Sequence, residues 1–182
     1  MVGLYIHIPF CRSKCTYCDF YSLPRMAKAD AVVDGLVEEF KARRSEIDEE
    51  FATIYIGGGT PSSLSPEQLR RLVSNLPVQS TREFTIEANP DDINANSVRQ
   101  WVDMGINRVS IGVQTLCDPV LKSIGRRHSA QQAIDAIHCL NDNGISNISA
   151  DLIYGLPGVY QQQWERDLDT VLSLPITHLS AY

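Results

Sequence analysis

The sequence contains no apolar stretch that approaches the roughly 18 residues needed to cross a membrane, so no transmembrane segment is expected. Its first ten residues, MVGLYIHIPF, lack a basic segment ahead of an apolar run, and we therefore expect a cytoplasmic protein. Positive charge is also scarce, because 16 Lys and Arg residues stand against 22 Asp and Glu residues, a formal net charge of −6. This balance disfavours a nucleic-acid partner.

Cysteine is rare as well, with five residues in a chain of 182, yet three of them fall within one short segment. Cys11, Cys15 and Cys18 form a C-x3-C-x2-C run inside HIPFCRSKCTYCDFYS. An odd number of cysteines in a reducing compartment disfavours a disulfide framework, which leaves metal binding or catalysis as the use of this run. We interpret Cys117 and Cys139, which lie outside it, as small apolar residues.

Short β-rich runs alternate with segments of helical periodicity along the chain. Strands are expected at 4–8, 53–57, 83–88, 108–113, 148–154 and 177–182. Helices are expected at 27–45, from Ser65 onward, at 95–104, from Ser129 to Gly144 and at 161–173. This alternation predicts one α/β domain over residues 1–182, with parallel strands and right-handed crossovers. It does not distinguish an open doubly wound sheet from a partial barrel, but in both folds ligands bind beyond the carboxyl ends of the strands.

Helix boundaries and the end of the chain carry further signals. Ser65, Pro66 and Gln68 predict a capping box at the start of one helix, and Gly105 suits the left-handed residue that ends the next. The sequence stops at Tyr182, inside the sixth expected strand. We therefore expect a domain that is truncated at its C-terminus.

The cysteine run suits two kinds of metal site. Thiolates are soft ligands that bind zinc or iron–sulfur clusters. A structural zinc site needs four protein ligands, and His7 or Asp19 is available as the fourth, so a zinc-binding structural module stays open as an alternative. Three cysteines on a four-iron cluster would instead leave one iron without a protein ligand, free to bind a substrate or cosubstrate.

The spacing of the cysteines, the strand before them and the later GGGTP resemble the radical S-adenosylmethionine (SAM) superfamily. The resemblance implies a partial (β/α)6 barrel in which three cysteines hold a 4Fe-4S cluster. It also implies that the amino and carboxylate groups of S-adenosyl-L-methionine chelate the open iron, and that an electron donor reduces the cluster. The motifs YIHIPFC, CDF, IYIGGGTPS, IEANP, SIGVQ, IGRRH and DLIYGLPG are similar to the branch that contains oxygen-independent coproporphyrinogen III oxidases and heme chaperones.

The resemblance also implies a set of site residues. The metal ligands are Cys11, Cys15 and Cys18. The residues expected to contact or flank SAM are Tyr5, Tyr17, Gly58, Gly59, Thr60, Glu87, Gln114, Arg126, Asp151 and Ile153. The chemistry suits the roles, because glycines permit close backbone approach, carboxylates accept from hydroxyls or an ammonium, and an arginine pairs with a carboxylate. The structural alternative for the glycines is a plain tight turn. For Asp151 it is a buried carboxylate that pairs with a helix N-terminus or an arginine.

Phe20 is the residue that separates the two activities of this branch. The oxidases carry a further cysteine two positions after the third cluster cysteine, whereas the chaperones have phenylalanine there, as this chain does. The resemblance therefore implies a heme chaperone that transfers heme to heme-accepting proteins. Radical decarboxylation of coproporphyrinogen III is the alternative, so the porphyrin partner and enzymatic activity stay open, and no catalytic residue is assigned.

Overall fold

The computed structural model describes residues 2–23 and 26–182. Six parallel strands form a single sheet whose spatial order is the same as their order in the chain. They are β1 (Val2–Ile8), β2 (Phe51–Gly58), β3 (Glu83–Ala88), β4 (Arg108–Gln114), β5 (Asn147–Leu152) and β6 (His178–Ala181). A sequential order means that every crossover moves in the same direction across the sheet, so right-handed crossovers place all connecting helices on one face.

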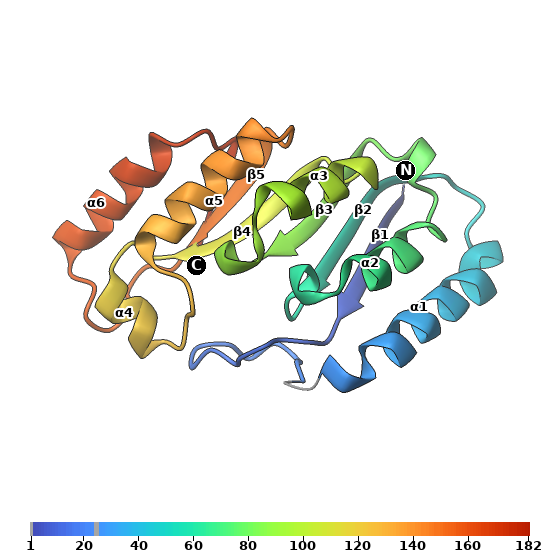
Figure 1. Cartoon of the computed structure of the whole chain (residues 1–182), viewed down its shortest axis with the longest axis horizontal. Helices are drawn as coiled ribbons and strands as arrows, with labels where there is room; N and C mark the ends of the chain where they lie inside the picture. The colour runs from blue at the N-terminus through green and yellow to red at the C-terminus, as the bar shows by residue number, and fades with distance from the viewer. Residues whose placement is uncertain (1, 24–25) are drawn as a thin grey trace.

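The helices cover that one face. They are α1 (Ala29–Arg43), α2 (Pro66–Val73), α3 (Ala95–Asp103), α4 (Asp118–Ser123), α5 (Ala130–Asp142) and α6 (Gln161–Leu172). In Figure 1, α2, α3 and α5 lie in front of the sheet, and α1 and α6 flank them. This singly wound arrangement is the partial barrel expected from the sequence, rather than a doubly wound sheet. No helix in the described ranges has both the length and the apolar character to cross a membrane.

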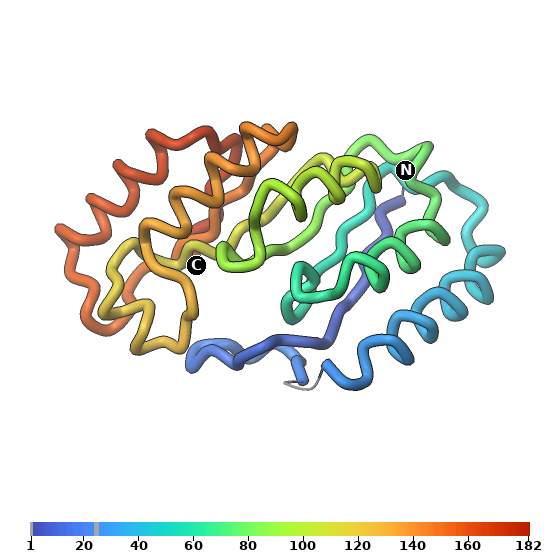
Figure 2. The backbone as a smooth tube through the Cα atoms, viewed as in Figure 1, coloured from blue at the N-terminus to red at the C-terminus, as the bar shows by residue number. Residues whose placement is uncertain are grey.

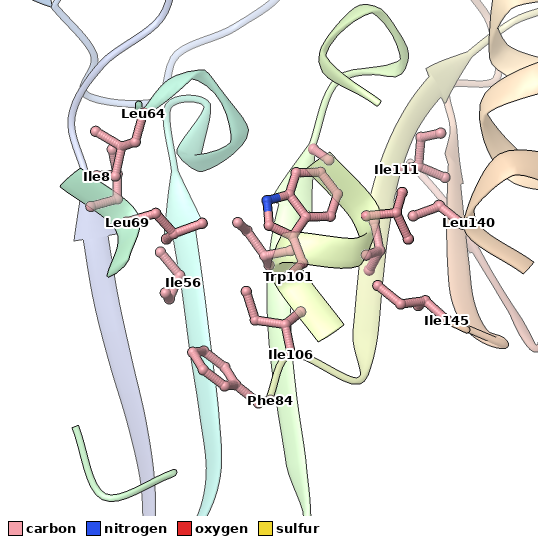
Figure 3. Packing of buried hydrophobic residues seen from close by; sticks show 14 of the residues in the cluster. Ile8, Ile56, Leu64, Leu69, Phe84, Trp101, Ile106, Ile111, Leu140 and Ile145 are labelled. Carbon is pink, nitrogen blue, oxygen red and sulfur yellow. The ribbon is translucent and has the colours of Figure 1, made fainter. Parts of the chain in front are cut away.

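The core fills the layer between the helices and the sheet. Figure 3 shows Ile56 and Phe84 of the strands packed near Leu69 of α2 and Trp101 of α3. Side chains on parallel strands alternate between the two faces, so the residues next to these core positions point the other way. The opposite face carries polar side chains instead, among them Glu87. This face, at the carboxyl ends of the strands, is where the candidate site lies.

The sequence located the expected elements closely, with one omission. β3 matches its expected bounds, and the others shift at their ends by a few residues. The capping box of Ser65 and Gln68 is present, and Gly105 has the expected positive φ, +87°. The short helix α4 was not predicted, because it has six residues and no side chain caps its start, although Asp118 and Pro119 stand in its first turn.

Ser129→Ala should destabilise the protein by about 1 kcal/mol, which is the usual cost of losing an N-cap. The Ser129 hydroxyl accepts from the backbone N–H of Gln132, 3.2 Å away, and the Gln132 side chain accepts from the N–H of Ser129. Urea unfolding measures the change in free energy. Ser173→Ala is the control, because its hydroxyl donates to a carbonyl at a helix C-terminus and leaves no backbone N–H without a partner. An equal cost for both variants would contradict the prediction.

Candidate functional site

A cavity of about 600 Å³ opens at the carboxyl ends of the strands. It collects the expected site residues from the cysteine segment, from four strands or the turns that follow them, and from the loop after α4. The expected residues that line it are Cys11, Cys15, Cys18, Tyr17, Gly58, Gly59, Thr60, Glu87, Gln114, Arg126, Asp151 and Ile153. Phe20 also lines it.

Tyr5 is the expected residue that the structure leaves outside this cavity. It lies on β1, and its hydroxyl is 3.0 Å from Nδ1 of His7. Nε2 of His7 is in turn 3.1 Å from the carbonyl of Tyr21. Tyr5 lines a smaller cavity between β1 and α1 instead. Its ring lies 6.0 Å from the ring of Tyr55, on the same face of the sheet as the main cavity, and its contact with SAM stays a prediction.

Backbone bonds and one ion pair hold the cysteine segment over the sheet. In Figure 2 this segment leaves β1 and runs alongside the region of α4. The N–H of Thr16 donates to the carbonyl of Ile124 at 3.1 Å, and Arg12 pairs with Asp92 at 3.2 Å. Asp92 also accepts from Ser62 at 2.8 Å. Residues distant in the sequence thus fix the position of the cysteines.

Hydrogen-bond donors surround two of the three sulfurs. The Thr60 hydroxyl donates to Sγ of Cys11 at 3.4 Å, and Nη1 of Arg126 donates to Sγ of Cys15 at 3.8 Å. Such hydrogen bonds orient the sulfur ligands of a metal site. Among the described residues, no group of three His, Cys, Asp or Glu side chains is arranged to hold a single metal ion. A four-iron cluster offers each cysteine its own iron, so its three ligands need not converge on one point.

The glycines after β2 allow two chain segments to approach closely. A Cβ at Gly59 would lie 2.4 Å from the carbonyl oxygen of Phe10, and Gly58 has φ +112° with the ring of His7 where its Cβ would be. The N–H of Thr60 donates to that Phe10 carbonyl at 2.6 Å. The glycines therefore join the β2 turn to the cysteine segment, a reason that the sequence alone did not indicate.

Gly59→Ala should destabilise the protein by about 3 kcal/mol or prevent soluble expression, because backbone atoms meet the new methyl group and cannot rotate away. Gly35→Ala is the matched control. Gly35 lies within α1 with no atom near its missing Cβ, and alanine there should stabilise the helix by up to about 1 kcal/mol. Urea unfolding measures both changes, and opposite signs are expected. A stable Gly59→Ala variant would contradict the proposed close approach.

Two half-buried carboxylates stand on the sheet side of the cavity. Oε1 of Glu87 accepts from the Tyr55 hydroxyl at 2.8 Å, and Oε2 accepts from the N–H of Gly58 at 2.9 Å. Asp151 accepts from the Ser110 hydroxyl at 3.0 Å. Burial raises the pKa of both carboxyls, and these hydrogen bonds oppose the shift. Both groups are held as hydrogen-bond acceptors.

Gln114 and Arg126 complete the cavity wall from neighbouring positions. Gln114 has φ +69°, which is rare for a residue with a Cβ, and it follows an irregularity in the pairing of β4 with β5. Nη2 of Arg126 donates to Oδ1 of Asn89 and to the carbonyl of Gly112, both at 2.7 Å. Within the described ranges, Nε of Arg126 is buried without a partner. A carboxylate from a ligand would suit this guanidinium better than the neutral carbonyls it now contacts.

Several residues of the site were not found from the sequence. Tyr55, Ser110 and Asn89 hold the predicted side chains, and alternation along each strand is the signal that places the first two on the cavity face. Arg127, next to the expected site residue Arg126, pairs with Asp91. Nothing in the local sequence indicates that partner.

Comparison with known proteins identifies the family. The model of the radical SAM superfamily matches residues 5–171. The chain belongs to the radical SAM superfamily. Members of this superfamily bind a 4Fe-4S cluster and SAM. The soft donors of the cysteine run and the partnerless Nε of Arg126 fit a cluster and a carboxylate-bearing ligand.

Individual members of the radical SAM superfamily are similar to this chain over nearly its whole length. The chain is 42% identical to "Heme chaperone HemW" of Lactococcus lactis, over 98% of this chain and 48% of the relative. It is 39% identical to HemW of Bacillus subtilis, over 100% of this chain and 50% of the relative. Among solved structures, coproporphyrinogen III oxidase (HemN) of Escherichia coli superposes with a TM-score of 0.89 at 28% identity, covering 98% of this chain and 43% of HemN. The chain spans about half the length of these relatives.

Proposed function

We propose that this chain forms the cluster- and SAM-binding part of a heme chaperone that transfers heme to heme-accepting proteins. The observation that carries the proposal is Phe20, which stands at the cavity where the oxidases of the branch carry a further cysteine. Phe20 is 68% exposed, so core packing does not explain a large apolar side chain there. The 42% identity to a HemW heme chaperone supports the same function.

In this proposal the chain's own residues bind and orient the cofactors. Cys11, Cys15 and Cys18 would hold the 4Fe-4S cluster, which supplies one-electron chemistry when bound and reduced. Arg126 would pair with the carboxylate of SAM, and Glu87 and Asp151 would accept from its hydroxyl or ammonium groups. Tyr17, whose pKa is raised by burial, would stay a neutral phenol against the cysteines and limit the access of water.

Coproporphyrinogen III oxidation is the second candidate function. The superposition on the E. coli oxidase, with a TM-score of 0.89 over 98% of this chain, favours it, because the two folds are alike. On this alternative, a propionate side chain would give up a hydrogen atom and then carbon dioxide, and a separate electron acceptor would take the remaining electron. Phe20 stands against it, since it cannot replace the thiol of the missing cysteine.

The deciding experiment is anaerobic. The cluster is reconstituted in the full-length protein, and SAM, a strong reductant and coproporphyrinogen III are added before the porphyrins are separated by chromatography. We expect unchanged coproporphyrin from protein with full iron content, and a stoichiometric shift in the absorption of heme when it is titrated in. Protoporphyrin in the product would favour the oxidase instead. Zinc-loaded protein that takes up no iron would overturn both functions.

A further inference from the structure

The best-defined hydrogen-bond network around the cavity includes a residue that does not line it. Tyr55 lies on β2 between Ile54 and Ile56, which are buried in the core, so its side chain points to the opposite face of the sheet. There its hydroxyl donates to Glu87 at 2.8 Å. Tyr55 therefore stands behind Glu87, with the carboxylate between it and the cavity.

Glu87 is held at both oxygens. Tyr55 donates to one, and the N–H of Gly58 donates to the other at 2.9 Å. Two donors on the two oxygens fix the plane of the carboxylate as well as its position. A buried acceptor fixed in this way needs little reordering when a ligand arrives, which is how a site gains affinity from its supporting residues.

The chain makes room for this contact. A Cβ at position 57 would lie 2.7 Å from the Tyr55 ring and 3.0 Å from Oε1 of Glu87. Gly57 has an ordinary φ, so its lack of a side chain is needed for the space between these two groups rather than for the backbone. The first glycine of the run therefore leaves the space in which the hydrogen bond between Tyr55 and Glu87 forms.

The Tyr55 hydroxyl bonds to one of the two carboxylates. It donates to Glu87, whereas Asp151 accepts from Ser110. Burial raises the pKa of Glu87, and the bond from Tyr55 acts in the opposite direction by stabilising the ionised form. Removing the hydroxyl would leave burial less opposed, so Glu87 would take up a proton at a higher pH.

We propose that Tyr55 is a positioning residue for SAM and that it acts by orienting the Glu87 carboxylate. The proposal rests on the proposed function, because it takes Glu87 as a SAM contact. It predicts that Tyr55→Phe binds SAM about tenfold more weakly near neutral pH, the effect expected from losing one hydrogen bond to a charged group. The weakening should grow as the pH falls.

The test is a double-mutant cycle on the full-length, cluster-loaded protein. The dissociation constant of SAM is measured across pH by equilibrium dialysis for the parent, Tyr55→Phe, Glu87→Gln and the double variant. If Tyr55 acts through Glu87, the double variant binds SAM no more weakly than Glu87→Gln alone. In the double variant and in Glu87→Gln, the affinity for SAM should lose the pH dependence that comes from Glu87. Tyr160→Phe, whose side chain is exposed on the surface, is the control for removing a phenol hydroxyl.

Each outcome has a distinct meaning. Equal affinity of the parent and Tyr55→Phe, or a Tyr55 effect that is undiminished in the Glu87→Gln background, would overturn the proposal, because Tyr55 would then be a packing residue. A cluster-loaded parent that binds no SAM would overturn the proposed function together with this inference. Iron content is measured for each variant, so that loss of the cluster is separated from loss of SAM.

Discussion

Cys15→Ala is expected to abolish stable binding of the 4Fe-4S cluster. Two remaining thiolates hold only two irons of the cube, and the donors now directed at the Cys15 sulfur, Nη1 of Arg126 among them, would lose their acceptor. After anaerobic reconstitution, the iron and acid-labile sulfide contents should fall to near background, and the brown colour should be lost. This is the largest effect that we expect from a single substitution in the chain.

Cys139→Ala is the matched control for that loss. Cys139 lies on α5, partly buried against the core, and its sulfur contacts the side-chain amide of Asn143 rather than the cavity. Its removal should leave iron and sulfide unchanged. A brown Cys15→Ala variant with the iron content of the parent would show that the ligands are misassigned, whereas loss of iron in both variants would indicate general unfolding.

The fold could be predicted from the sequence because its determinants are local. The apolar runs of the strands, the capping boxes at Ser65 and Ser129 and the glycine at 105 each specify their own segment. The order of the strands could not be derived from alternation, because a doubly wound sheet uses the same elements. It was the resemblance to a family that separated the partial barrel from that alternative, and the sequential sheet confirms it.

The candidate site was predicted less completely, for a physical reason. The residues that bear recognisable chemistry, such as Cys11 and Glu87, could be named from motifs, but the groups that hold them come from other strands. Ser110 is 41 residues from the aspartate to which it donates, and Arg12 is far in sequence from its partner Asp92. Only the folded sheet, together with the segments that follow its strands, brings such pairs together. The position of Tyr5 likewise depends on the neighbouring strand, because its ring lies 6.0 Å from the ring of Tyr55.

Asp151→Asn is expected to lower the affinity for SAM while raising the stability of the protein without SAM. The asparagine keeps an acceptor for the Ser110 hydroxyl, so the local hydrogen bond survives, but the negative charge is lost. A hydrogen bond to a charged group contributes about 1.5–3 kcal/mol, so its loss should raise the dissociation constant of SAM roughly ten- to hundredfold. Equilibrium dialysis with cluster-loaded protein measures the loss, and iron content should not change.

The effect on stability follows from the raised pKa of Asp151. Burial, the largest cause, makes the folded protein hold the Asp151 proton more tightly than the unfolded chain does. This carboxyl therefore contributes its whole stabilisation below its pKa in the unfolded chain, about 3.9. The contribution is lost as the pH rises through its pKa in the folded protein. Asparagine carries no such cost at any pH, so urea unfolding should show Asp151→Asn more stable than the parent at pH 7, with the difference vanishing under acid conditions. A carboxylate that serves ligand binding lowers the stability of the protein when the ligand is absent. An Asp151→Asn variant that is less stable than the parent at pH 7 and binds SAM equally well would therefore show that Asp151 is a structural partner.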